Sequence, residues 1–157
     1  MNITDKKNIN IKGRNIVIIG IGQSGAAAGK LAKYLGANVL ISESNSNSKI
    51  ISLSKKIESY GIDVELGGHS EKIFNADLWV VSPGVPKDIS IIKKASKHNI
   101  NIVSEIEFAS WFTSSQIIAI TGSNGKTTTV NLLFEMCNIK ELEPILGGNI
   151  GIAFSGL

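Results

Sequence analysis

Short runs of β-branched residues alternate with stretches that carry apolar residues at helical spacing, and this alternation constrains the fold more than any other feature. The strand-like runs are residues 15–19, 38–42, 62–66, 77–82, 101–103 and 116–121. The helix-like stretches are residues 24–35, 49–60, 88–98 and 105–112. Strands joined by helices pair in parallel through right-handed crossovers. We therefore expect an α/β fold with a doubly wound parallel sheet.

A glycine-rich loop follows the first expected strand. Gly20, Gly22 and Gly25 form a complete G-x-G-x-x-G at a helix start, and Glu43 ends the next strand. Such glycines allow a tight turn and the close approach of a diphosphate, while an acidic residue there accepts hydrogen bonds from a ribose. The motif predicts a Rossmann-like domain. A nicotinamide or flavin cofactor, another nucleotide diphosphate and a turn without ligand all remain open.

A second loop of the phosphate-binding type precedes a helix expected over residues 129–137. Residues 121–128 read Thr-Gly-Ser-Asn-Gly-Lys-Thr-Thr, and Ile120 stands where the common P-loop has its first glycine. In such a loop backbone N–H groups surround the phosphates, Lys126 reaches the terminal ones, and the Thr127 hydroxyl joins the Mg²⁺ shell. The pattern predicts ATP or a related triphosphate, with Lys126 as the catalytic residue. The alternative is an ordinary glycine turn with a solvated lysine.

The two loops in one chain change the interpretation of the first. A dehydrogenase has no use for a triphosphate loop, so we expect the first loop to hold a nucleotide-diphosphate substrate and the second to supply the energy. Two alternatives remain. One is an NAD-dependent oxidoreductase built on the first loop and Glu43, and the other is a nucleotide-binding module without turnover.

Five stretches of the sequence resemble the MurD branch of the Mur ligase family. They are residues 20–27, 82–86 (Ser-Pro-Gly-Val-Pro), 104–108 (Ser-Glu-Ile-Glu-Phe), 120–129 and 147–151 (Gly-Gly-Asn-Ile-Gly). Their order and spacing follow the family over nearly the whole chain. The resemblance implies an ATP- and Mg²⁺-dependent ligase of peptidoglycan synthesis, monomeric at full length. Such a ligase adds D-glutamate to UDP-N-acetylmuramoyl-L-alanine through an acyl phosphate.

The resemblance also assigns roles to residues at matching positions. Those implied to bind the UDP-sugar are Gly22, Gln23, Ser24, Glu43, Ser44, Ser82, Pro83, Gly84 and Asn149. Those implied to bind ATP are Gly122, Ser123, Asn124, Gly125, Lys126, Thr127 and Thr128, with the magnesium ion on Thr127. Two positions depart from the family. Ser123 stands where Thr is usual, and Glu43 stands where Asp is common, which moves the carboxylate one methylene outward.

The same resemblance implies a division into domains. Residues 1–113 would form the Rossmann-like UDP-sugar-binding domain. Residues 114–157 would begin the ATP-binding central domain, and a C-terminal domain would be absent. On this pattern we expect no turnover by the chain alone.

Charge and hydropathy exclude other classes of function. The formal net charge of +3 arises entirely within residues 1–14, and the remainder holds equal numbers of acidic and basic side chains. That balance does not indicate a nucleic-acid partner. The sequence has no apolar run long enough to span a membrane and no hydrophobic leader, so we expect no membrane insertion and a cytoplasmic location.

Three polar residues that have no assigned role in binding are His69, Glu105 and Glu107. His69 is a loop residue that we interpret as structural or exposed. Glu105 and Glu107 open a helix, where carboxylates interact favourably with the positive end of the helix dipole. We do not expect either to be a catalytic base.

Overall fold

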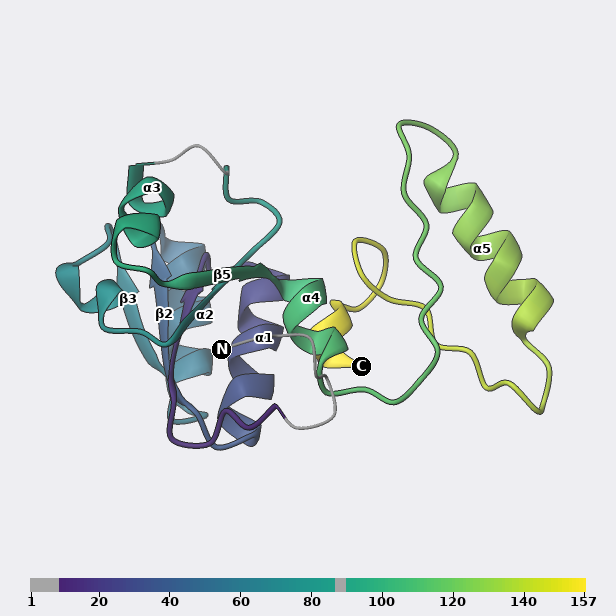
Figure 1. The fold of residues 1–157 in the computed structure, drawn as a ribbon. Coiled ribbons are helices and arrows are strands. Elements are labelled where there is room, and N and C mark those ends of the chain that lie inside the picture. Colours follow the sequence, from purple (N-terminus) through teal and green to yellow (C-terminus); the bar gives the residue numbers. More distant parts are fainter. Residues whose placement is uncertain (1–8, 87–89) are drawn as a thin grey trace.

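The computed structural model describes residues 9–86 and 90–157. The strands are β1 (Asn15–Ile19), β2 (Asn38–Glu43), β3 (Asp63–Leu66), β4 (Leu78–Val81) and β5 (Asn101–Ser104). The helices are α1 (Gln23–Tyr34), α2 (Ser48–Glu58), α3 (Ser90–Lys97), α4 (Glu105–Ser110) and α5 (Lys126–Cys137). Residues 88 and 89, which we assigned to the third helix, lie outside the described residues. The described residues also contain the 3-10 turns Glu71–Phe74 and Phe154–Gly156 (Figure 1).

All five strands pair in parallel, in the order β3-β2-β1-β4-β5. The α/β fold with a doubly wound parallel sheet is therefore confirmed. The chain winds outward from β1 to β3 and then returns to β4 on the other side of β1. In sheets of this kind, ligands bind where the winding reverses, outside the carboxyl ends of the strands.

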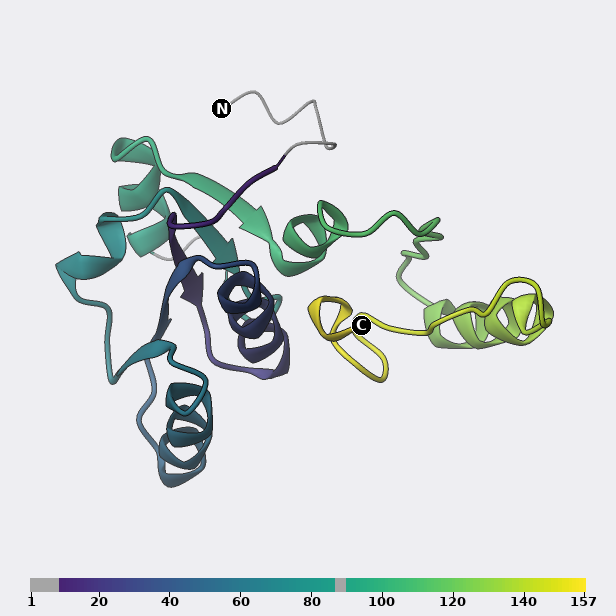
Figure 2. The same ribbon diagram turned by 90° about the horizontal axis from the view of Figure 1, so that it is seen from below.

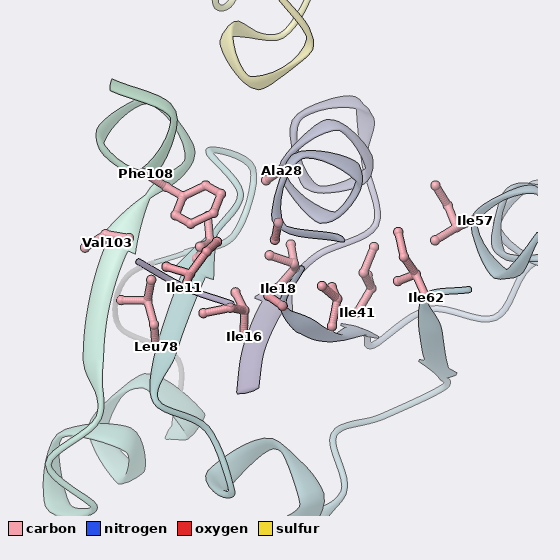
Figure 3. Close-up of a cluster of buried hydrophobic side chains, with 14 of the residues drawn as sticks. Ile11, Ile16, Ile18, Ala28, Ile41, Ile57, Ile62, Leu78, Val103 and Phe108 are labelled. Carbon is pink, nitrogen blue, oxygen red and sulfur yellow. The ribbon is translucent and has the colours of Figure 1, made fainter. Parts of the chain in front are cut away.

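Apolar side chains fill both faces of the sheet. On one face Ile16 and Ile18 of β1 join a cluster with Ala28 of α1 and Phe108 of α4 (Figure 3). On the other face Val17 and Ile19 join a second cluster, whose further buried members are Ile73, Trp79, Ala95 and Ile100. Successive side chains of a strand point to opposite faces. Burial on both faces explains why β1 is apolar at every position from 16 to 19.

The turn from β1 into α1 depends on close packing at two glycines. Gly20 has a φ of +93°, in the left-handed region. A Cβ atom on Gly25 would lie 1.8 Å from the carbonyl oxygen of Gly20 and 2.7 Å from Oγ of Ser82. That same Oγ donates a hydrogen bond to the Gly20 oxygen at 3.0 Å. The start of α1 is thus packed directly on the loop that precedes it.

The prediction of a strand over residues 116–121 is wrong. These residues form no strand, and Ile117 and Ile118 are 47% and 66% exposed. An extended segment becomes a strand only when a neighbour satisfies its backbone hydrogen bonds, and none of the described strands pairs with this segment.

The helix expected over residues 129–137 begins earlier, at Lys126. This helix, α5, stands apart from the sheet and its covering helices in both views (Figures 1 and 2). None of its residues is buried. Within the described part of the chain, no helix is both long and apolar enough to cross a bilayer.

After α5 the chain returns to the sheet. Gly147 and Ile152 form an isolated bridge, and the N–H of Gly148 donates to the carbonyl of Ile152 at 2.8 Å. The following turn, Phe154–Gly156, packs against α1 and α4 (Figure 2). We call residues 147–157 the returning segment.

The packing at Gly25 predicts a large loss of stability for Gly25→Ala. The added Cβ would force the Gly20 backbone to move, and overpacking of this kind costs about 1–3 kcal/mol. Gly22→Ala is the matched control, because a Cβ there meets nothing within 4 Å. Urea denaturation measures both free energies of unfolding. Equal values for the two variants would contradict the packing argument.

Candidate functional site

A cleft of about 710 Å³ opens at the carboxyl ends of the central strands. Every residue that the sequence implied for UDP-sugar binding lines it: Gly22, Gln23, Ser24, Glu43, Ser44, Ser82, Pro83, Gly84 and Asn149. They come from the β1–α1 loop, the first turn of α1, the ends of β2 and β4, and the returning segment. The structure brings these separate motifs together at the point where the sheet's winding reverses. Their role in binding stays a prediction.

The N-terminus of α1 forms one wall of the cleft. Gly22 caps this helix without a side-chain hydrogen bond, and the first turn holds no acidic residue. The first N–H groups of a helix lack partners within the helix and carry partial positive charge. Because Gly22, Gln23 and Ser24 all line the cleft, this wall suits an anionic group such as a diphosphate.

Glu43 connects the end of β2 to the glycine loop. Its Oε2 accepts a hydrogen bond from the N–H of Ile21 at 3.1 Å. Its Oε1 accepts three: from the N–H of Asn45 at 2.8 Å, from Nδ2 of Asn45 at 3.1 Å, and from Oγ of Ser44 at 3.3 Å. Each carboxylate oxygen accepts about two hydrogen bonds. Oε1 is therefore fully engaged, and Oε2 keeps one place for a ligand hydroxyl or N–H.

These contacts also set the protonation of Glu43. Burial by itself would raise the pKa of this carboxyl group, but the hydrogen bonds from the backbone of Asn45 and Ile21 and from the Asn45 and Ser44 side chains outweigh it. The net effect is a pKa below the ordinary value of 4.5. Hydrogen bonds to the charged form explain this direction, because protonation would break them. Glu43 is thus an anion that organises the loop.

His69 lies closer to the site than its sequence context indicated. We expected a structural or exposed residue, and the structure places it, half-buried, in the lining of the cleft. Its Nδ1 is 2.6 Å from Oγ of the buried Ser42, and that Oγ donates to Oε1 of Glu65 at 2.6 Å. A serine hydroxyl has one proton. Because that proton goes to Glu65, Nδ1 of His69 must carry the ring proton and donate it to Ser42.

The returning segment closes one side of the cleft. Gly148 and Asn149 line it, and Nε2 of Gln23 donates to the carbonyl of Gly151 at 3.0 Å. This bond joins the glycine-rich loop after β1 to the Gly-Gly-Asn-Ile-Gly loop. The two motifs are therefore one structural unit although they lie far apart along the chain.

The second loop lies outside this cleft. All residues from 121 to 129 are exposed, and none of them lines the cleft. Gly125, with a φ of +75°, caps α5, and Nζ of Lys126 donates to the carbonyls of Gly122 and Ser123. A helix N-terminus, a lysine and the Thr127 hydroxyl are the groups that a P-loop offers to a triphosphate and its magnesium ion.

In the part of the chain that the structure describes, no acidic or histidine cluster stands beside this loop to hold a cation. Among residues 9–86 and 90–157, no group of three His, Cys, Asp or Glu side chains is placed to bind a metal. A magnesium ion here would depend on Thr127, nucleotide phosphates and water, which are usual ligands of Mg²⁺ in nucleotide sites. The hydroxyl oxygen of Thr127 is a ligand of the kind that Mg²⁺ prefers.

Comparison with known proteins agrees with the resemblance. Residues 14–104 match the family model described as Mur ligase MurD-like, N-terminal domain. The UDP-N-acetylmuramoylalanine–D-glutamate ligases of Chlorobaculum parvum and Chloroherpeton thalassium are 40% and 42% identical over 149 residues. Each alignment covers 92% of this chain and 32% of the relative. The chain thus spans about a third of the length of these curated relatives.

Solved structures of Mur ligases share the fold. A murein peptide ligase from Psychrobacter arcticus aligns with a TM-score of 0.57 at 28% identity, over 77% of this chain and 25% of its own. A UDP-N-acetylmuramate:L-alanyl-gamma-D-glutamyl-meso-diaminopimelate ligase from Neisseria meningitides aligns with a TM-score of 0.57 at 22% identity, over 90% and 46% of the two chains. This second likeness concerns the fold alone. Because the family model covers more than half of the chain, the chain belongs to the Mur ligase MurD-like family and contains its N-terminal domain.

Proposed function

We propose that this chain is the nucleotide-binding part of a ligase that adds D-glutamate to UDP-N-acetylmuramoyl-L-alanine in peptidoglycan synthesis. The observation that carries the proposal is that three of the five MurD-like stretches, residues 20–27, 82–86 and 147–151, meet Glu43 and Ser44 at one cleft. The curated relatives are named for this reaction. Residues 1–113 would bind the UDP-sugar, and residues 114–157 would belong to the ATP-binding domain.

The cleft offers suitable groups for a uridine diphosphate. The N–H groups at the start of α1 would receive the diphosphate, together with Asn149 of the returning segment. Glu43 would use its one open acceptor place on the uridine. A dinucleotide domain of the NAD type instead uses its acidic residue to accept from the adenosine ribose. Oε1 of Glu43 already accepts three hydrogen bonds, so the carboxylate has too few free acceptor positions for two ribose hydroxyls.

The second loop would supply the energy for bond formation. A carboxylate is a poor electrophile, so its oxygen would first attack the terminal phosphorus of ATP, releasing ADP and forming an acyl phosphate. The amine of D-glutamate would then attack the carbonyl carbon, form the amide, and release phosphate and a proton. Lys126 would exchange its contacts with Gly122 and Ser123 for the transferring phosphoryl group and offset its charge. Thr127 would hold the magnesium ion.

The choice of nucleotide tests the proposal. We expect calorimetric titration of the chain to show binding of UDP-N-acetylmuramoyl-L-alanine and none of NADH. Glu43→Gln would weaken this binding about tenfold, because an amide places a donor group among the N–H donors that Glu43 now accepts. Glu58→Gln, on the exposed end of α2, is the matched control. Binding of NADH without the UDP-sugar would support an oxidoreductase and contradict the ligase.

The lowered pKa of Glu43 predicts how stability depends on pH. A carboxyl group whose pKa is depressed on folding stabilises the protein above its unfolded value, here 4.5. That contribution disappears as the pH falls through the lower folded pKa. Measured from neutral pH downward, the free energy of unfolding should fall less steeply below about pH 4.5 in Glu43→Gln than in the wild type. If the two curves of unfolding free energy against pH are parallel, ionised Glu43 does not stabilise the loop through its hydrogen bonds.

Removal of the loop lysine tests the second half of the proposal. In a form of the protein that carries out the ligation, Lys126→Ala should slow phosphate release by about 10²–10³-fold, the usual cost of losing one group that stabilises transition-state charge. The affinity for the UDP-sugar should not change, because Lys126 lies outside the cleft. Lys140→Ala, at an exposed position after α5, is the control. Full activity of Lys126→Ala would exclude the proposed role.

A further inference from the structure

Glu105 is a buried carboxylate that the proposed chemistry does not use. It is the first residue of α4, and 1% of its surface is exposed. Ser155 in the returning segment donates two hydrogen bonds to its Oε1, one from the backbone N–H and one from Oγ. Among the described residues, the salt bridge that forms is between Arg14 and Asp77, and it does not involve Glu105. Glu105 is held by hydrogen bonds instead.

Such a residue is costly to bury without its partners. An ionised carboxylate taken from water is stable in an apolar setting only when hydrogen bonds compensate for the lost hydration. For Glu105 these bonds come from Ser155. The contact therefore favours the state in which the turn Phe154–Gly156 is docked against α1 and α4.

Docking of that turn fixes a wall of the cleft. Ser155 follows closely on the bridge between Gly147 and Ile152, which closes the loop that carries Asn149. Gln23 donates a hydrogen bond to the Gly151 carbonyl within this loop. Glu105 accepts a hydrogen bond from Ser155, which lies shortly after the loop. Glu105 does not itself line the cleft. Its effect on a ligand must pass through the returning segment.

We propose that Glu105 is a positioning residue of the nucleotide site, which holds Asn149 at the cleft by anchoring the returning segment through Ser155. The inference rests on the proposed function for the identity of the ligand. The anchor itself is a property of the chain without ligand.

Glu105→Met is the variant that tests the anchor. Methionine has a similar volume and suits a buried site, but it offers no strong acceptor to Ser155. We expect faster amide hydrogen exchange over residues 147–157, with the protection of β1 and β4 unchanged. The affinity for UDP-N-acetylmuramoyl-L-alanine should fall about tenfold, as expected for the loss of hydrogen bonds to a charged group.

Two further variants separate positioning from a general effect of substitution. Glu105→Gln keeps an oxygen that accepts both bonds from Ser155, so both readouts should stay close to the wild type. Glu107→Met makes the same change at an exposed position of the same helix and should alter neither readout. If Glu105→Met does not fold, Ser155→Ala removes only the hydroxyl bond and should give a smaller change of the same kind. Unchanged exchange and affinity in the folded variant tested would overturn the inference.

A double-mutant cycle with Asn149→Ala decides whether Glu105 acts through this residue. If it does, Glu105→Met should have little further effect on affinity once Asn149 is removed, because interacting residues are not additive. Additive losses would overturn the positioning role. If the wild-type chain does not bind the UDP-sugar, the proposed function is wrong, and so is the proposal that Glu105 positions Asn149 for this ligand. The exchange experiment without ligand would still show whether Glu105 holds the returning segment.

Discussion

The contact between Gly25 and the carbonyl oxygen of Gly20 fixes the starting point of α1, and the rest of the site is built around it. The loop between these residues is held from both neighbouring strands. On the side of β2, Glu43 accepts the N–H of Ile21, and on the side of β4, Ser82 donates to the Gly20 carbonyl. The direction of the first N–H groups of α1 is thus set by strands on either side of β1. A Cβ atom at position 25 would collide with both the Gly20 carbonyl and the Ser82 hydroxyl.

The fold could be predicted largely because the central strands β1 and β4 are buried on both faces. A strand in that position must be apolar at successive residues, as β1 is from Ile16 to Ile19, and such runs are visible without knowledge of their partners. The segment 116–121 has the same appearance and forms no strand. Its composition allows a strand, but pairing decides whether one exists, and pairing is a property of the tertiary structure.

The lining of the cleft could be predicted for a related reason. Parallel strands end at the same edge of a sheet, so residues that follow β1, β2 and β4 meet there. The place of Asn149 was instead implied by the family resemblance. What the sequence could not supply were contacts between residues without a shared motif. The contact with Ser42 fixes which ring nitrogen of His69 carries the proton, and Ser155 donates hydrogen bonds to Glu105. The position of His69 shortly after β3 was the available signal for its place at this edge.

The bond between Gln23 and Gly151 closes a loop that contains most of the chain. Closing a long loop carries an entropic cost, which the contacts of the returning segment must offset. A ligand that touched both the start of α1 and Asn149 would act as a reversible cross-link between these distant parts. By mass action its concentration would then set how firmly the returning segment is held, so that the substrate itself would complete the folding of its own site.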